Sequence, residues 1–290
     1  MISKIKITFY LFVFLIILNS VVNSQETITV YTTYQHKITD NKPDPLKIAI
    51  DQKTYTQEDF LVLERLYDSE IGKQTFYILY FYNDSNKLIS KECYSMNNKP
   101  EYLIRYNYNA RGDTLVEIIF KPVKDTVFIE STITYEYNKN NKIARLRTFN
   151  SKNRLTETTD IYYNIKEMPE KKEINYKKCK TNNVKSIEIN YIYNENDTLI
   201  KENSIQKDCK RNISESSVLY NYDKNGMLEK EIISTSGELL SKEEFYFMNN
   251  GILFRHNIFD KNNNLVKAFS FTEKNHFITL GNVKSYWGRK

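Results

Sequence analysis

The chain has 290 residues, of which 40% are hydrophobic and 27% charged, and its formal net charge is +6. This length and balance exclude a fully disordered chain and are sufficient to bury a hydrophobic core. Aromatic residues reach 14%, with 23 Tyr and 16 Phe, whereas there are only 7 Gly. The scarcity of Gly argues against Gly-rich phosphate-binding loops, and the abundance of Tyr, Phe, Thr and Ile favours strands over helices.

The first 24 residues have the layout of a secretory signal peptide. Lys4 and Lys6 precede an apolar stretch at 7–18, and small or medium residues lead to a cleavage site between Ser24 and Gln25. The alternative is an uncleaved membrane anchor, but the apolar stretch is shorter than the ~20 residues that a spanning helix needs. We therefore predict a secreted, periplasmic or cell-surface chain with no membrane contact after cleavage.

Residues 25–66 are predicted to form an N-terminal segment of strand and loop that caps a sheet. A Thr- and Tyr-rich run at 27–34 reads as a strand, and a loop with two prolines follows at 41–45. The stretch Thr56-Gln-Glu-Asp59 before an apolar run is typical of a helix cap. The phase of the aromatic pattern that starts at Tyr67 favours a strand instead, so both alternatives remain open for 57–66.

Between residues 67 and 270 one short pattern recurs. An aromatic residue is followed by Asn or Asp, two variable residues, Asn or Gly, one variable residue, and Leu or Ile; clear copies start at Tyr82, Tyr137, Phe149, Tyr193, Tyr222, Phe247 and Phe259. Asn, Asp and Gly tolerate left-handed backbone angles and therefore turn the chain. The flanking runs alternate as half-buried strands do. Because Tyr-x-Tyr precedes every second turn, the unit is one β-hairpin of about 27 residues.

This pattern resembles the YD repeats of Rhs-type and teneurin-type proteins, whose core is Tyr-x-Tyr-Asp-x-x-Gly-x-Leu. Residues Tyr220–Leu228 match that core at every position. The pattern also resembles the variant MORN repeats of secreted bacterial proteins, although most copies here carry Asn where those families carry Gly. The resemblance implies hairpin architecture. We predict an all-β fold, an antiparallel β-meander of about seven hairpin repeats that forms an extended, twisted or curved sheet.

Residues 271–290 are predicted to be a C-terminal cap or tail, and the three cysteines lie before it. Cys93 is expected to be a buried thiol on a strand. Cys179 and Cys209 are 30 residues apart, one hairpin period, which places both in similar turns at one edge of the sheet. Strands two apart are separated by ~9.6 Å, more than the ~7 Å between Cα atoms that a disulfide tolerates. Extended loops at these turns would close the gap, so a disulfide between Cys179 and Cys209 and two unpaired cysteines both remain open.

The tyrosines that lead into the turns are the candidate binding residues. As structural residues they would form layers of Tyr and Leu in the core, whereas an exposed stripe of their rings would bind glycans by stacking. The residues concerned are Tyr82, Tyr108, Tyr137, Tyr193 and Tyr222. After the turns Lys and Glu alternate, as in Glu229-Lys230-Glu231 and Lys242-Glu243-Glu244, which predicts cross-strand ion pairs rather than paired catalytic carboxylates.

The sequence offers little catalytic chemistry. The three His residues have no second ligand at metal-binding spacing, and no nucleophile motif is present. Without residues 1–24 the charge is about +4 and no dense basic patch exists, which argues against nucleic acid as a partner. We therefore expect a chain that is not an enzyme and that needs no cofactor and no metal.

The function we predict is a binding or structural scaffold at the cell envelope, whose partner is an unknown protein or a glycan. One alternative is an immunity or antitoxin-like partner of a toxin, as the resemblance to variant MORN repeats implies. A second alternative is a cell-wall glycan-binding module that uses the tyrosine stripe. A hydrolase is the third, and it would need paired carboxylates, or a His beside a nucleophile, in a cleft.

Overall fold

The computed structural model describes residues 26–123, 126–179, 183–222, 228–234, 236–248 and 252–278. Every regular element in these ranges is a β-strand, which confirms the all-β prediction. The predicted cleavage site at Ser24 and Gln25 lies outside the described residues, as do residues 279–290 of the predicted tail. No segment of the described chain forms a helix with the length and hydropathy needed to cross a membrane.

Eighteen strands follow one another along the chain. They are β1 (Glu26–Thr39), β2 (Lys42–Tyr55), β3 (Leu61–Tyr67), β4 (Gln74–Tyr82), β5 (Leu88–Ser95), β6 (Pro100–Tyr108), β7 (Thr114–Val123), β8 (Thr126–Tyr137), β9 (Ile143–Asn150), β10 (Leu155–Tyr163), β11 (Pro169–Tyr176), β12 (Val184–Tyr193), β13 (Leu199–Asp208), β14 (Ile213–Tyr222), β15 (Leu228–Ser234), β16 (Leu239–Phe247), β17 (Leu253–Asp260) and β18 (Leu265–Ile278). Each strand pairs antiparallel with its neighbours in the sequence, for example β1 with β2 and β17 with β18.

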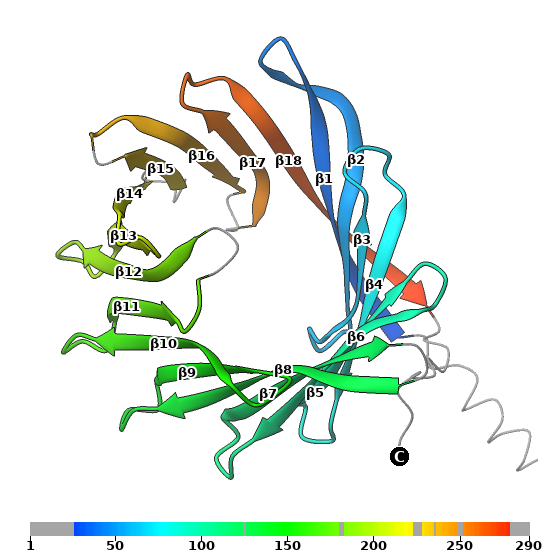
Figure 1. Ribbon diagram of the computed structural model, residues 1–290. Coiled ribbons are helices and arrows are strands. Elements are labelled where there is room, and N and C mark those ends of the chain that lie inside the picture. The colour runs from blue at the N-terminus through cyan, green and yellow to red at the C-terminus, as the bar shows by residue number, and fades with distance from the viewer. Residues whose placement is uncertain are drawn as a thin grey trace, which may run out of the picture.

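The sheet closes on itself. The first strand, β1, pairs with the last, β18, from Glu26 opposite Ile278 to His36 opposite Ala268, and in Figure 1 the strands follow one another around a ring. The molecule is therefore a closed antiparallel barrel of eighteen strands. The predicted extended sheet of about seven hairpins is wrong.

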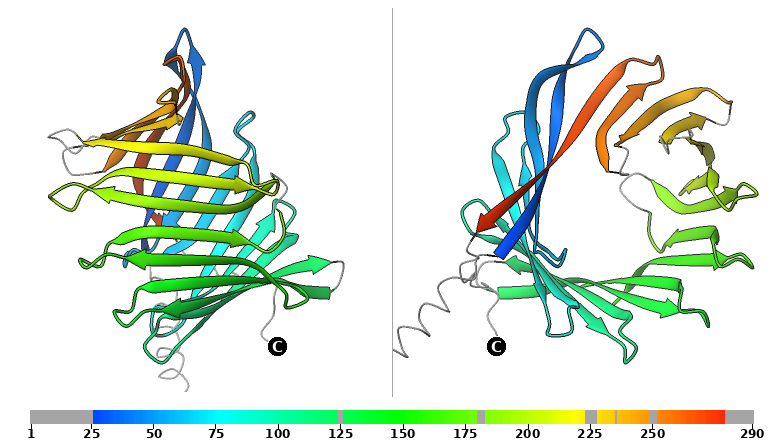
Figure 2. Two further views of the ribbon diagram at one scale, coloured as in Figure 1. Left: turned by 60° about the vertical axis from the view of Figure 1, so that its left-hand side comes forward. Right: turned by 180° about the vertical axis from the view of Figure 1, so that it is seen from behind.

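The terminal strands explain the closure. β1, β2 and β18 have 14 residues each. β1 and β2 precede the first copy of the turn pattern, and the last copy ends at Leu265, the first residue of β18, so the pattern gives no sign that β1 and β18 pair. In Figure 2 the blue and orange-red strands at the two chain ends run steeply, while the green strands run across the left-hand view. The twist of a long antiparallel sheet curls it, and pairing its first and last strands removes both exposed edges.

The hairpin turns explain why Asn is so abundant. After β4, the backbone N–H of Asn86 donates to the carbonyl of Asn83 at 2.9 Å, and Oδ1 of Asn83 accepts from the N–H groups of Ser85 and Lys87. Asn86 has a φ of 58°, the left-handed region that Asn and Gly enter most readily. The equivalent position of other turns is held by Asn98, Gly112, Asn141, Asn153, Asp197 and Asn263.

Residues 57–66 lead into a strand and contain no helix. Thr56 closes a turn before β3, because its backbone N–H donates to the carbonyl of Phe60 at 2.9 Å and its Oγ1 accepts from the Phe60 N–H at 3.2 Å. The pattern that is typical of a helix cap thus serves a turn. β1, β2 and β3, which come from the predicted N-terminal segment, all take part in the closed sheet.

The barrel wall has two faces, and directly opposed residues of antiparallel strands share one of them. We call the face that carries the first tyrosine of the Tyr-x-Tyr pairs the tyrosine face. The most buried side chain is Ala268 on β18, which is 1% exposed. On β4–β6 buried side chains lie on both faces: Ile78 and Cys93 on the tyrosine face are 7% and 3% exposed, and Leu79 and Leu103 on the opposite face are 9% and 3% exposed. Most other side chains are half-buried, as expected for a wall one sheet thick.

Candidate functional site

The second tyrosine of most Tyr-x-Tyr pairs joins two strands. The hydroxyl of Tyr82 on β4 donates to the carbonyl of Leu61 at the start of β3, at 3.0 Å. Equivalent bonds of 2.5–2.9 Å run from Tyr108 to Leu88, from Tyr137 to Thr114, from Tyr163 to Ile143 and from Tyr193 to Pro169. Four of the five predicted binding tyrosines therefore use their hydroxyls inside the sheet, which favours a structural role. The fifth, Tyr222, is 47% exposed.

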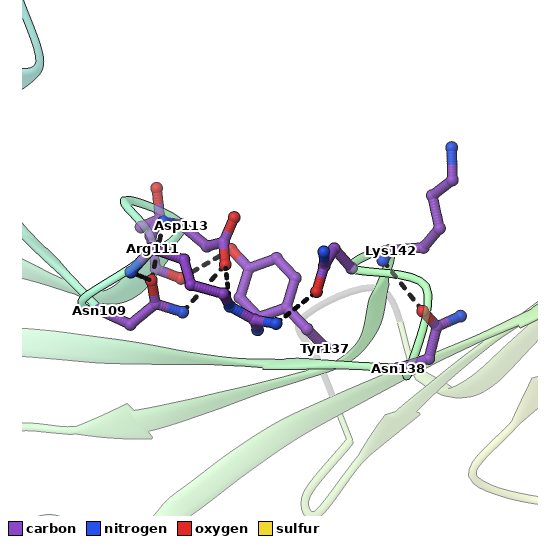
Figure 3. Close-up of polar contacts among 8 residues, drawn as sticks. Asn109, Arg111, Asp113, Tyr137, Asn138 and Lys142 are labelled. Carbon is purple, nitrogen blue, oxygen red and sulfur yellow. Dashed lines mark hydrogen bonds and ion pairs between the residues drawn. The ribbon is translucent and has the colours of Figure 1, made fainter.

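The turns after β6, β8, β10 and β12 lie at one end of the barrel, and their side chains contact one another. Figure 3 shows Arg111, from the turn after β6, beside Tyr137: its Nε lies 3.3 Å from Oδ2 of Asp113, and its Nη1 donates to Oδ1 of Asn141 in the turn after β8 at 2.5 Å. Farther along, Lys166 Nζ reaches Oδ1 of Asp197 at 2.6 Å, again joining alternate turns. We call this end the motif rim, and the end with the turns after β3, β5, β7, β9 and β11 the far rim.

A belt of charged residues crosses the tyrosine face. In five hairpins the position directly opposite the first aromatic residue holds Lys91, Glu117, Glu202, Lys230 or His256, and Glu64 has the same place on β3. Opposite Tyr135 this position holds Leu146. In several hairpins this residue comes three places after the strand's first residue, as in Leu88 to Lys91 and Leu199 to Glu202. That spacing is visible in the sequence, and it is the signal that could have identified the belt.

The first tyrosines bond to the carboxylates of this belt. Their hydroxyls donate to the Glu of the preceding strand at 2.7 Å from Tyr80 to Glu64, 3.0 Å from Tyr135 to Glu117 and 2.8 Å from Tyr220 to Glu202. Burial, reinforced by the neighbouring carboxylate, raises the pKa of all three tyrosines above the usual range. They therefore remain neutral hydrogen-bond donors and do not act as bases near neutral pH.

The belt ends in a cluster around Glu243 on β16. Lys230 Nζ lies 3.3 Å from one carboxylate oxygen and His256 Nε2 lies 3.1 Å from the other. The His256 ring stacks on Phe245 at 4.3 Å and on Phe269 at 5.5 Å between centroids, and burial lowers its pKa. The Lys230–Glu243 pair is one of the cross-strand ion pairs that the alternating charges predict, and it is confirmed.

An apolar hollow opens on the tyrosine face between the belt and the far rim. Its volume is about 440 Å³, and we define the apolar hollow by its wall residues Leu66, Phe76, Ile104 and Ile119 with Cys93 and Tyr102 between them. The registers that place these residues on one face pair Ile78 with Cys93, Cys93 with Tyr102 and Ile104 with Ile119. Five strands contribute, so no local sequence pattern marks the site.

The polar groups of the apolar hollow lie at its centre and at its mouth. Cys93 is a buried thiol outside any disulfide, and its side chain is hydrogen-bonded to that of Tyr102. Burial raises the pKa of the thiol and raises the pKa of Tyr102 to about 12. The thiol therefore stays protonated and unreactive at neutral pH. At the mouth, Lys121 Nζ lies 3.5 Å from Oε1 of Glu130, and Glu101 stands beside them.

The described residues include no group of three or more His, Cys, Asp or Glu side chains arranged to hold a metal ion. Cys179 and Cys209 are joined by a disulfide with 6.0 Å between their Cα atoms. Cys93 is 3% exposed, as expected of a buried thiol, and this prediction is confirmed.

Comparison with known proteins leaves the family open. A scan of protein families and a search of curated proteins find no match. Among solved structures, the chain is similar to the TcdB2–TccC3–Cdc42 complex, with 10% identity over 80% of this chain and 18% of that one and a TM-score of 0.30. It is also similar to porin-like proteins of Bacteroides uniformis (12% identity, 86% and 98% of the two chains, TM-score 0.41) and Bacteroides vulgatus (9%, 83% and 96%, 0.35). At these scores the likeness carries no argument about function.

Proposed function

We propose that the chain is an exported binding protein without enzymatic activity and that its ligand site is the apolar hollow. The observation that carries the proposal is the hollow itself. Its volume of about 440 Å³ lies within the range of small-molecule sites, about 300–1,000 Å³. Apolar walls with a few convergent polar groups are the usual lining of such sites.

The lining defines the ligand chemistry. Phe76, Ile104 and Ile119 favour a molecule with an apolar body, and burying that body releases about 25 cal/mol per Å² of apolar surface. The hydroxyl of Tyr102 offers one hydrogen-bonding group inside the hollow. Glu101 at the mouth has no ion-pair partner among the described residues, so it suits a polar or cationic head that stays near water.

The side chains around the apolar hollow support binding rather than catalysis. The Cys93 thiol is protonated at neutral pH, and the tyrosines of the belt are held neutral by burial and by their carboxylate partners. The signal-peptide layout of residues 1–24 supports export to the envelope.

The proposal is tested with a neutral apolar dye such as Nile red and the chain without residues 1–24. Ile104→Asp places a charge in the apolar hollow and should weaken dye binding about tenfold or more, because a bound apolar dye would take water away from the carboxylate. Ile104→Trp should weaken binding by filling the space. The matched control is Ile192→Asp, since Ile192 is 39% exposed on the opposite face. Binding unchanged in both Ile104 variants would remove the apolar hollow from consideration.

A second candidate function is favoured by the hairpin of β7 and β8. At its end Val127, Phe128 and Ile129 are 48%, 54% and 45% exposed, and Val123 is 50% exposed. Contiguous apolar residues of this kind are typical of a protein-docking surface, as a scaffold or an immunity partner of a toxin would need. Co-purification of the chain with the product of an adjacent toxin gene, and its loss in Phe128→Ser but not in Ile192→Ser, would support this function.

A further inference from the structure

A second hollow lies at the far rim on the tyrosine face, between the turn from β9 to β10 and the end of β11. Its volume is about 370 Å³, and its lining includes Tyr176, which is 8% exposed. Arg154 contributes one wall, and Lys177 and Lys178, which follow β11, contribute the other. We call this site the cationic hollow.

The charges of the cationic hollow are unbalanced. Three cationic side chains, those of Arg154, Lys177 and Lys178, line it together with a single carboxylate, that of Glu157. None of the three cations forms a side-chain hydrogen bond or an ion pair with another described residue. Some lysines elsewhere in the barrel are paired, as Lys230 is with Glu243 and Lys166 with Asp197. What sets the cationic hollow apart is that three cations with no partner among the described residues line one concave surface. Unpaired positive charge around a concave surface attracts anions.

The backbone that carries the lysines is held in place. The N–H of Lys177 donates to the carbonyl of Thr156 at 2.9 Å, and Lys185 Nζ donates to the carbonyls of Tyr176 at 2.7 Å and Lys177 at 3.1 Å. The disulfide of Cys179 then ties the end of the segment to Cys209. These bonds fix the segment before any ligand arrives, which lowers the entropy lost on binding.

We infer that the cationic hollow is an oxyanion site that takes a phosphate, sulfate or carboxylate group on a body about the size of one sugar. The fork of the Arg154 guanidinium suits two oxygens of such a group, and the two lysines add point charges. The volume lies near the lower end of the small-ligand range, about 300–1,000 Å³, and therefore suits a single sugar-sized unit. This site is separate from the apolar hollow and does not depend on the function proposed for it.

Calorimetric titration of the chain without residues 1–24 tests the inference. The probes are inorganic phosphate, glucose 6-phosphate, glucuronate and glucose, at low ionic strength. The charged sugars should bind, glucose should not, and the order of phosphate and carboxylate ligands identifies the preferred oxyanion. Raising the salt concentration should weaken binding, since exposed charges are screened beyond about 10 Å at 0.1 M. Equal binding of glucose and glucose 6-phosphate, or no binding of any probe, would overturn the site.

Variants locate the binding. The Lys177→Ala/Lys178→Ala pair should weaken the tightest probe at least tenfold, and Arg154→Lys should weaken it less while keeping the charge. The matched control removes the same charge elsewhere, with Lys139→Ala and Lys261→Ala in exposed turns away from the cationic hollow. If the control pair loses as much affinity as the Lys177/Lys178 pair, the effect belongs to net charge and the inference is wrong. Thermal unfolding of each variant checks that it is folded.

Discussion

The two hollows lie on the same face and at the same rim of one barrel, yet they have different chemistry. The apolar hollow is walled by residues such as Ile104 and Ile119 and holds a protonated thiol, whereas the cationic hollow is lined by Arg154 and Lys177. The pairing of the strands around both is the same antiparallel ladder. A few side-chain positions near the far rim therefore decide what each part of the wall can bind, while the turns and the motif rim remain alike.

The two regions are also held together in different ways. Beside the apolar hollow, tyrosine hydroxyls bond to carboxylates of the belt, as Tyr80 does to Glu64 and Tyr135 to Glu117. Beside the cationic hollow the corresponding tie is covalent, the disulfide from Cys179. Removing a tyrosine hydroxyl should therefore weaken the region of the apolar hollow, and removing the disulfide should weaken the region of the cationic hollow.

The largest expected effect comes from the disulfide. Replacing Cys179 and Cys209 together by Ser should lower the free energy of unfolding by about 2–4 kcal/mol, the usual contribution of a disulfide that closes a loop of this length. Phosphate-ligand binding should weaken because the lysine segment is no longer tied, whereas Nile red binding should persist. Urea unfolding and both titrations measure this. Cys93→Ser is the reciprocal variant: it leaves the disulfide intact and changes the lining of the apolar hollow, so it should alter Nile red binding and leave phosphate-ligand binding unchanged. Equal losses at both hollows in either variant would contradict the separation.

The second-largest effect on the free energy of unfolding is expected beside the apolar hollow. Tyr135→Phe removes the hydroxyl that bonds to Glu117 at 3.0 Å and should cost about 1–3 kcal/mol of unfolding free energy, since a half-buried carboxylate loses its donor. Tyr162→Phe is the matched control. Tyr162 is 46% exposed and its bond to Glu173 is 3.2 Å, so its loss should cost close to nothing. Equal costs would mean that the belt does not stabilise the barrel.

The turns and strands could be predicted from the sequence because their formation depends on residues that are close together in the chain. Asn83 and Asn86 favour a turn whatever the rest of the chain does, and the alternating residues on either side favour strands. Closure could not be predicted in this way. It depends on the pairing of β1 with β18, which lie at opposite ends of the described chain, and the turn pattern links only strands that are neighbours in the sequence.

The two hollows could not be predicted from the sequence for the same reason, because residues far apart in the chain form them. Cys93 and Ile119 both line the apolar hollow although they are 26 residues apart in the sequence and strand β6 lies between their strands. Lys177 and Lys178 read as part of an ordinary basic stretch, and only the register of β10 and β11 places them near Arg154. The tyrosines were conspicuous in the sequence because they recur, and in the structure that recurrence serves strand-to-strand bonding.

Cys93 gives a prediction that concerns the apolar hollow alone. Burial raises the pKa of its thiol above the ordinary value, so alkylation by iodoacetamide should be slow at pH 7.5 and should still be rising with pH at pH 9. In urea the same thiol should titrate near pH 8.5. Because the folded pKa is the higher one, the unfolded chain loses its proton first, and the stabilising contribution is lost as the pH rises above about 8.5. A plateau in the folded rate below pH 8.5 would contradict the burial of this site, and saturating Nile red should slow the reaction further.

The smallest expected effect is that of removing Lys121 at the mouth of the apolar hollow. Lys121 and Glu130 form an ion pair 3.5 Å long whose side chains are 58% and 51% exposed, so Lys121→Ala should change the free energy of unfolding by no more than about 0.5 kcal/mol. Nile red affinity should stay within about twofold, because a neutral ligand gains little from a solvated charge. Removing Lys177 and Lys178 from the cationic hollow is expected to have the opposite outcome, a large loss of affinity with little loss of stability. If Lys121→Ala weakened the neutral dye tenfold, charge would govern both hollows and the contrast between them would not hold.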